Sequence, residues 1–361
     1  CSIFHQKYGF DSPRLWRRAL LGATWDFLVD RKRYEKLVLE MGVSGPTGMS
    51  LILKSFRPEV AIFTGVAPAH LAEGQFADEE AIFEEKVKLI RSMESGTAIL
   101  NRDDPFCRRL ESEDLAADRL WYGRRPENEP SDSLPPGLYF DRLSSSAEGI
   151  TAEVHVSPSP IFPELRSESH TLTCPILGEH HVYVLLPAIL TGLILGIDLQ
   201  QACGQLRSYS LPPGRLSVIP GAGSSTIIDS SWNASPRSVE AALETLGNHP
   251  AGRRIALLGC MMHLGDASES SHRAVGRLVP RHADMLITVG PEARIIGEEA
   301  SAHGMPSDSI RCFEALQGAV DYLRGIIGRD DVILVKGSSP LSLERGIKSL
   351  MRDPDQADRL V

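Results

Sequence analysis

The sequence predicts an α/β protein with two successive domains. The first is built around a mostly parallel sheet with a small antiparallel sheet beside it, and the second is doubly wound. Three patterns support this prediction. Short aliphatic and β-branched runs early in the chain are typical of strands covered on both faces. Alternating polar and apolar residues between 138 and 156 indicate antiparallel strands, and from residue 226 short apolar runs alternate with amphipathic segments. We expect the domains to span residues 1–208 and 209–361.

The composition fits a soluble globular protein. The chain has 361 residues, a net charge of −9 and 42% hydrophobic residues, and its six cysteines form no CxxC pair that would indicate a zinc site. No apolar run approaches the roughly 18 residues that a membrane span needs. The sequence also does not start with a basic segment followed by an apolar stretch, as a signal peptide would. Clustered Lys/Arg residues, which nucleic-acid binding would require, are absent from the sequence. We therefore expect a cytoplasmic protein with neither a membrane nor a nucleic acid as partner, and a monomer.

The first elements are a helix, two strands and a second helix. Apolar residues at helical spacing predict a helix between Phe10 and Arg33. Leu37–Met41 and Val60–Val66 are short, mostly apolar runs that predict buried parallel strands. From Asp78 to Met93 the apolar residues follow a helical stripe. The stripe contains Ile82, Phe83, Val87, Leu89, Ile90 and Met93.

Three polar residues stand out around these elements. Glu40 ends the first strand and His70 follows the second, which places both at the carboxyl edge of the sheet, where open α/β folds bind ligands. Lys86 lies inside the apolar stripe of the second helix. Taken singly, Glu40 can cap a neighbour, His70 can be a loop histidine, and Lys86 can bury its stem and extend its ammonium group to solvent. Their shared context makes them candidates for a metal site.

The middle of the chain predicts a strand at Arg119–Tyr122 and, after a Pro/Glu/Ser-rich loop, a subsidiary antiparallel pair at Leu138–Leu143 and Ile150–Val156. A helix is expected from Gly178 to about Leu195. The second domain then alternates strands and helices in a Rossmann-like order but lacks a GxGxxG motif. Its predicted elements are Thr226–Ile228, Pro236–Leu246, Arg254–Leu258, Ser268–Val279, Met285–Val289, Glu292–Ala302, Phe313–Ile326, Val332–Val335 and a helix from about Leu341.

The run from Val38 to Pro105 resembles the central, ATP-using domain of the Mur ligases, which form amide bonds in peptidoglycan precursors. The matching stretches are LEMGVSGPTG (39–48), RPEVAIFTGVAPAHL (57–71), EEKVKLI (84–90) and GTAILNRDDP (96–105). Further matches are IIDSSWNASPRSVEAAL (227–243), RRIALLGCMMHLG (253–265), SHRAVGRL (271–278) and LVKGS (334–338). The motifs are similar to those of the branch that adds D-alanyl-D-alanine to the UDP-muramoyl-tripeptide.

The resemblance implies roles for specific residues. Glu40, His70 and a carbamylated Lys86 would hold Mg²⁺, because a carbamate replaces a buried cation with an oxygen ligand for a hard cation. Arg215 in the hinge motif Pro-Pro-Gly-Arg would meet the phosphates of ATP, and with Lys86 it would form the catalytic set. The residues implied at the nucleotide are Asn101, Asp104, His180, Asp229 and Arg215, and those implied at the other substrates are Asn233, Lys336 and Ser338.

The chain departs from the family pattern at several of these places. His181 and Val184 stand where the family has asparagines, and Ser230 stands where it has the ribose-binding aspartate, unless a shift of one residue gives that role to Asp229. Two acidic groups are missing from Cys260–Gly265. The family's phosphate loop has no counterpart, since no GxxxxGK[ST] occurs in the sequence. We expect that loop, and the family's N-terminal domain, to precede this sequence.

The resemblance implies ATP-dependent amide formation. ATP phosphorylates a substrate carboxylate, the amine attacks the acyl phosphate, and phosphate leaves. Such a reaction needs Mg²⁺ and a cationic group near the transferring phosphoryl. Two alternatives stay open, because the second domain has diverged more than the first. One is a related ligase of the folate-glutamate or cyanophycin type, and the other is a catalytically impaired relative that binds nucleotide or acts as a partner subunit.

Overall fold

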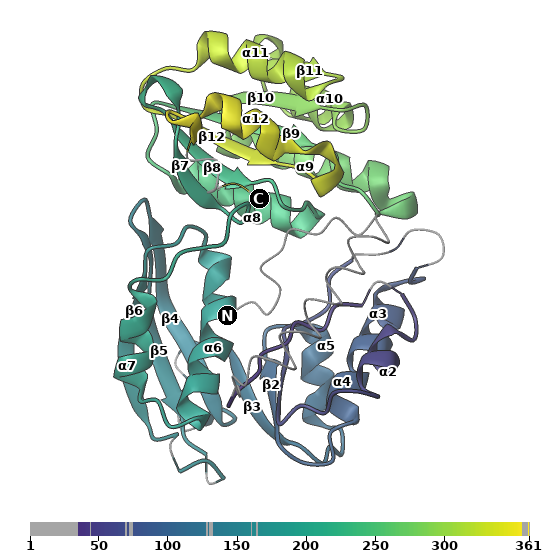
Figure 1. The fold of residues 1–361 in the computed structure, drawn as a ribbon, viewed down its shortest axis with the longest axis vertical. Helices are drawn as coiled ribbons and strands as arrows, with labels where there is room; N and C mark the ends of the chain where they lie inside the picture. The colour runs from purple at the N-terminus through teal and green to yellow at the C-terminus, as the bar shows by residue number, and fades with distance from the viewer. Residues whose placement is uncertain are drawn as a thin grey trace, which may run out of the picture. The chain divides into compact units, whose positions relative to one another are not determined.

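The computed structural model describes residues 35–43, 45–68, 71, 75–127, 129, 133–159, 161–163, 165–355 and 360. The chain divides into two compact units, residues 1–42 and 43–361. The second unit contains two six-stranded sheets, each flanked by helices (Figure 1). This architecture confirms the predicted α/β fold.

The first sheet has the strand order β1-β2-β3-β4-β5-β6. Its strands are β1 (Val60–Phe63), β2 (Thr97–Asn101), β3 (Asp118–Arg124), β4 (Gly137–Ser146), β5 (Gly149–Ser157) and β6 (Glu168–Cys174). Strands β1 to β4 run parallel, and β4 to β6 run antiparallel. The predicted antiparallel pair is therefore present, but the prediction of a separate subsidiary sheet was wrong. The first four residues of β4 are all buried and pair with β3, and only its later residues alternate between buried and exposed.

Helices cover this sheet. Helix α6 (Val182–Ile194) packs its leucines and isoleucines onto the residues of β3, β4 and β5 in one apolar core, and α7 (Leu199–Leu206) packs beside β6. The short helices α2 (Gly48–Ile52), α4 (Lys88–Arg91) and α5 (Pro105–Arg108) lie with α3 (Glu79–Lys86) near β1 and β2 (Figure 1). Across the described ranges, no helix is both long and apolar enough to cross a membrane.

The helix predicted over Asp78–Met93 is present as α3 and α4. The two are joined through Val87, which keeps helical backbone angles (φ −66°, ψ −19°), and Asp78 caps α3 by accepting a hydrogen bond from the Ala81 N–H at 2.8 Å. Ile82, Phe83, Val87, Ile90 and Met93 are buried, as the stripe predicts. The helix predicted between Phe10 and Arg33 lies outside the described residues.

The predicted strand at Leu37–Met41 was wrong. Residues 35–43 contain no strand, and Val38 is 91% exposed. An apolar run becomes a strand only when a neighbouring strand pairs with it. Leu37–Met41 is not a member of either sheet among the described strands.

The second sheet has the order β11-β10-β9-β12-β8-β7, and only the β7–β8 pair is antiparallel. Its strands are β7 (Ser217–Pro220), β8 (Thr226–Ser230), β9 (Arg253–Gly259), β10 (Met285–Val289), β11 (Ile310–Phe313) and β12 (Asp331–Lys336). Its helices are α8 (Pro236–Asn248), α9 (Ser268–His282), α10 (Arg294–Ala302), α11 (Leu316–Ile326) and α12 (Leu343–Leu350). The edge strands β7 and β11 were not predicted, and Phe313 ends β11 instead of starting a helix.

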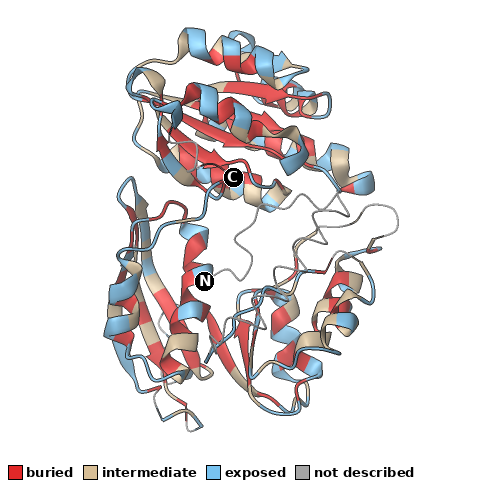
Figure 2. Ribbon diagram, in the orientation of Figure 1, coloured by how far each residue is buried: buried red, intermediate tan, exposed pale blue. Residues whose placement is uncertain are grey.

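Successive residues of the central strands point into two different cores. Ile227, Ile255 and Ile333 join a core with α11 and α12, whereas their neighbours Ile228, Ala256 and Leu334 join one with α8, α9 and α10. This arrangement explains the unbroken apolar runs in the sequence, because both faces of a parallel sheet are covered. Figure 2 shows the buried strands between exposed helix faces.

Candidate active site

The carboxyl end of β2 carries Asn101 and Asp104. The Asn101 side chain donates to the Thr64 carbonyl at 3.0 Å and accepts from the Asp103 N–H at 3.0 Å. Asp104 is 5% exposed, and its carboxylate accepts from the N–H groups of Val66, Phe106 and Cys107 at 2.9–3.2 Å. A Cβ on Gly65 would collide with this carboxylate. Both side chains thus tie the loop after β1 to the start of α5, and their contact with adenosine stays a prediction.

Removing Asp104 should destabilise the domain more than removing an ordinary helix cap. Asp104→Ala removes the cap of α5 and leaves the buried Val66 N–H without its acceptor, so we expect a loss of about 3 kcal/mol. The matched control is Asp78→Ala, which removes the exposed cap of α3 and should cost about 1 kcal/mol. Urea unfolding of both variants measures the difference. Equal losses would show that the loop does not depend on Asp104.

Lys86, at the end of α3, is half-buried and forms no hydrogen bond or ion pair with any residue that the structure describes. Burial lowers its pKa from the usual lysine value, although the charge of Asp104 opposes the shift. The lowered pKa raises the fraction of molecules in which Lys86 is a neutral amine. The neutral amine is the form that reacts with carbon dioxide. This chemistry fits the carbamate that the resemblance implies.

The other two predicted metal ligands, Glu40 and His70, stay predictions. Glu40 is exposed and belongs to the first compact unit, and His70 lies outside the described residues. Within the part of the chain that the structure describes, no group of three or more His, Cys, Asp or Glu side chains could hold a metal ion. The Mg²⁺ site stays a prediction that depends on the carbamate.

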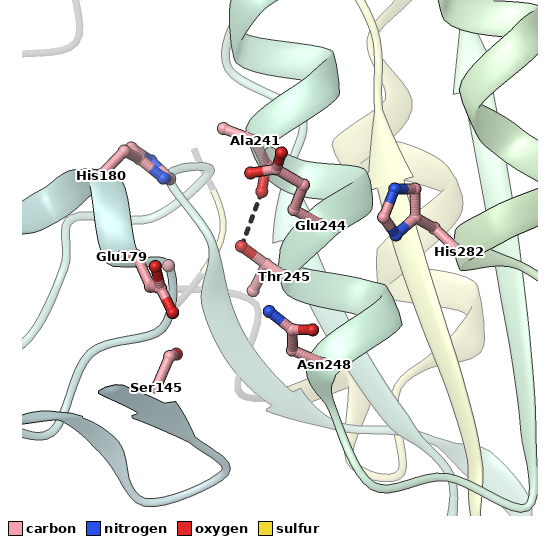
Figure 3. Close-up of a pocket in the computed structure, with 9 residues that line it drawn as sticks. Ser145, Glu179, His180, Ala241, Glu244, Thr245, Asn248 and His282 are labelled. Atoms are coloured by element: carbon pink, nitrogen blue, oxygen red, sulfur yellow. Dashed lines mark hydrogen bonds between the residues drawn. The ribbon is translucent and has the colours of Figure 1, made fainter. Parts of the chain in front are cut away.

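His180 and His181 precede α6 with their ring centroids 4.2 Å apart. His181 is buried, its Nδ1–H donates to the Leu177 carbonyl at 2.7 Å, and burial lowers its pKa. The neutral imidazole of His181 therefore holds the turn before α6 through this hydrogen bond. His180 is exposed and lines a pocket of about 290 Å³ together with Glu179, Glu244 and His282 (Figure 3). No lysine or arginine is found among the described residues that line it, so this pocket suits an uncharged group better than a phosphate.

At the carboxyl edge of the second sheet, Lys336 ends β12 and is 4% exposed. Its ammonium group donates to Ser230 Oγ at 3.2 Å and to the Asn233 carbonyl at 2.8 Å. Ser338 Oγ accepts from the Met262 N–H at 2.9 Å. The structure thus brings the Lys336 ammonium group to the backbone of the turn at Asn233, and the role of these residues at the substrate stays a prediction. Burial, reinforced by the charge of Arg215, lowers the pKa of Lys336 to about 8.

The lowered pKa of Lys336 predicts a rise of stability with pH. The unfolded chain binds more protons than the folded one between pH 8 and the usual lysine pKa of 10.5, so stability increases with pH in that window. Relative to Lys336→Met, the native chain should gain about 2 kcal/mol in unfolding free energy between pH 7 and about pH 9.5. Lys348→Met, which changes an exposed lysine of α12, is the control. A constant difference between native chain and Lys336→Met would show that Lys336 is not desolvated.

Two bonded carboxylates around the first sheet were not identified from the sequence. Glu85 is buried in α3, where it accepts from the Met49 N–H at 2.8 Å and pairs with Lys88 at 2.7 Å. Asp103 accepts from Tyr183 Oη at 2.8 Å and from the Arg124 N–H at 2.6 Å, which links β3 to α6. A carboxylate three residues before a lysine was the available signal for Glu85. No local pattern announces a bond between Asp103 and a residue 80 positions away.

Two family models match the chain. The Mur ligase middle domain matches residues 23–192, and the Mur ligase glutamate ligase domain matches residues 214–339. The chain is 27% identical over 323 residues to UDP-N-acetylmuramoyl-tripeptide–D-alanyl-D-alanine ligase of Bacillus subtilis, which covers 89% of this chain and 65% of that relative. The chain therefore spans slightly less than two thirds of the length of this curated relative.

Solved structures share the fold. The crystal structure of MurF ligase from Thermotoga maritima in complex with ADP has a TM-score of 0.72 at 23% identity, covering 93% of this chain and 71% of that one. Folylpolyglutamate synthase of Mycobacterium tuberculosis, complexed with ADP and AMPPCP, has a TM-score of 0.61 at 17% identity, covering 90% and 70%. At these identities the likeness concerns the fold. Because the two Mur ligase models together match most of its residues, the chain belongs to the Mur ligase family.

Proposed function

We propose that the chain forms the central and C-terminal domains, residues 1–208 and 209–361, of an ATP-dependent ligase that joins D-alanyl-D-alanine to the carboxylate of UDP-N-acetylmuramoyl-tripeptide. The observation that carries the proposal is the match over 89% of the chain with the Bacillus subtilis enzyme of that name. The reaction passes through an acyl phosphate, which the amine attacks. We place the protein in the cytoplasm as a monomer.

Arg215 is the group that meets the phosphates in this proposal. Its side chain is exposed beside the carboxyl end of β8, while the residues on either side of it are buried. A guanidinium can bind two phosphate oxygens at once and stabilise the charge of the transferring phosphoryl. The buried ammonium group of Lys336 lies near enough to Arg215 for the two charges to interact.

Lys86, Glu40 and His70 would hold Mg²⁺. When bound, this ion would neutralise the negative charge of the phosphate oxygens. The neutral amine of Lys86 adds to carbon dioxide and releases one proton, which yields a carbamate anion. Half-burial favours this reaction, because it lowers the pKa of Lys86. Glu40 contributes a carboxylate oxygen, so the donor set suits a hard divalent cation.

The nucleotide and the second substrate have their own residues. His180 lines a pocket with no lysine or arginine among its described lining residues and would contact the nucleoside part of ATP, together with Asn101 and Asp104. Asn233, Lys336 and Ser338 would bind the amine or the tripeptide. Closure of the second domain over the first would exclude water from the acyl phosphate.

A second candidate is a ligase of the folate-glutamate type. The divergence of the second domain favours it, since Ser230, or Asp229 after a shift of one residue, stands where the family has the ribose-binding aspartate. The cyanophycin type and an impaired nucleotide-binding relative are the remaining alternatives.

Product analysis distinguishes these candidates. The protein is incubated with ATP and Mg²⁺, either with UDP-N-acetylmuramoyl-tripeptide and D-alanyl-D-alanine or with a folate and L-glutamate. Mass spectrometry should detect the pentapeptide product with the dipeptide alone, in step with release of ADP and phosphate. A glutamate adduct of a folate would support the second candidate. Absence of every adduct, with ATP still bound, would identify an impaired relative.

A further inference from the structure

Asp229, near the end of β8, is completely buried, and its two carboxylate oxygens are both used. Oδ2 accepts from the Gly214 N–H at 3.1 Å, and Oδ1 accepts from the Ser231 N–H at 3.0 Å and from Ser231 Oγ at 2.6 Å. Burial raises the pKa of this carboxyl, while these hydrogen bonds and the charge of Lys336 oppose the shift. Burying a carboxylate costs desolvation free energy. The hydrogen bond of Asp229 to Gly214, in the hinge motif before Arg215, therefore needs an explanation.

The bond to Gly214 fixes the base of Arg215. Gly214 is held a second time, because its carbonyl accepts from the Trp232 N–H at 3.2 Å. Its φ of +74° is in the left-handed region, which suits glycine. On the other side of Arg215, Leu216 is 3% exposed and also has a positive φ of +61°, an uncommon conformation for a residue with a side chain. The exposed arginine therefore projects from a backbone that is fixed on both sides.

The guanidinium of Arg215 lies 5.9 Å from the ring centroid of Trp232, within the range of a cation–π contact. Trp232 is 45% exposed and follows Ser231, the second residue that Asp229 holds. One buried carboxylate thus orients both partners of this contact, since it bonds to the residue before the arginine and to the residue before the tryptophan.

We propose that Asp229 is a positioning residue that holds Arg215 against Trp232, in place of the ribose contact that the sequence predicted for it. The proposal rests on the proposed function for its use, because Arg215 is the phosphate contact there. Asp229 itself touches neither the nucleotide nor the reacting atoms. It sets the direction from which the guanidinium meets the phosphates.

The indole N–H signals of the chain test this directly. The protein has four tryptophans, so a spectrum of ¹⁵N-tryptophan-labelled protein contains four indole signals, and Trp232→Phe assigns one of them. Asp229→Asn puts an amide donor opposite the N–H of Gly214 or Ser231. We expect it to move the Trp232 signal toward its position in Arg215→Ala, with little further change in the double variant, as coupled residues require. An unmoved Trp232 signal in Asp229→Asn would overturn the proposal.

Asp331→Asn is the matched control. Asp331 is a buried aspartate at the opposite end of β12, where it pairs with Arg253 and accepts from the Gly328 N–H. This variant should leave the Trp232 signal in place. If Asp229→Asn does not fold, hydrogen exchange of the native chain decides instead: a strongly protected Gly214 amide supports the proposal, and exchange at the rate of a free loop overturns it.

Turnover separates this proposal from the proposed function. Asp229→Asn should lower kcat about as much as Arg215→Ala does, with the KM for ATP changed less than threefold, whereas Asp331→Asn should leave both constants unchanged. A native protein without ligase activity would refute the proposed function, and the Trp232 signal would still show whether Asp229 holds Arg215. A displaced Trp232 signal with unchanged kcat would overturn the positioning role.

Discussion

Lys86→Ala should abolish ATP-dependent phosphate release, and small carboxylates such as formate or acetate at high concentration should restore part of it. Lys86 is half-buried with a lowered pKa, so its neutral amine can form a carbamate that serves as an oxygen ligand. Alanine leaves a space that a carboxylate can fill with the same type of oxygen. A coupled phosphate assay with increasing carboxylate concentrations measures the rescue.

Two variants control this experiment. Lys86→Arg should be inactive and should not be rescued, because it keeps a positive charge and fills the space. Lys88→Ala removes a neighbouring lysine that pairs with Glu85 at 2.7 Å, and it should retain activity. Full activity of Lys86→Ala without any additive would contradict the account, since Lys86 would then only extend its ammonium group to solvent.

Arg215→Ala should lower turnover by about 100-fold or more while the melting temperature stays within a few degrees. The loss follows from removing a charged donor that acts on the transferring phosphoryl. The small change of stability follows from the exposure of the side chain, for which effects are typically about ±0.5 kcal/mol. Steady-state kinetics and thermal unfolding of the same preparation give both values.

Arg311→Ala is the matched control for Arg215→Ala. Arg311 also lies over an aromatic ring, with its guanidinium 5.7 Å from the ring centroid of Tyr322, but it belongs to the edge strand β11. Its removal should leave turnover unchanged. Loss of folding in Arg215→Ala would identify Arg215 as a structural hinge residue instead of a phosphate contact.

Local pattern predicted most of the fold because both cores of the second sheet require unbroken apolar strands. The prediction failed where pairing with a neighbouring strand decides whether a segment becomes a strand and to which sheet it belongs. Leu37–Met41 has the composition of a strand but is not paired in the described chain. Leu138–Leu143 was assigned to a subsidiary sheet because the alternation further along β4 masks the fully buried first residues of this strand, which pair with β3.

The structure gives two of the predicted nucleotide residues bonds that the sequence did not reveal. Asp104 and Asp229 stand in motifs for which the resemblance implies contact with the nucleotide. In the structure, both carboxylates accept hydrogen bonds from backbone N–H groups. The Asp-Pro step at 104–105 is a local sign of a helix cap and could have indicated this for Asp104. The bond from Asp229 to Gly214 joins residues 15 positions apart through the β7–β8 pairing, which no local signal reveals.

The transfer of an isotope from the carboxylate to phosphate tests the proposed reaction most directly. UDP-N-acetylmuramoyl-tripeptide labelled with ¹⁸O in its reacting carboxylate is incubated with the protein, ATP, Mg²⁺ and D-alanyl-D-alanine, and the released phosphate is analysed by mass spectrometry. Formation of an acyl phosphate requires that one carboxylate oxygen leave with the phosphoryl group, so each released phosphate should carry one ¹⁸O atom. Unlabelled phosphate would mean that water attacks ATP, which would contradict the proposed ligase reaction.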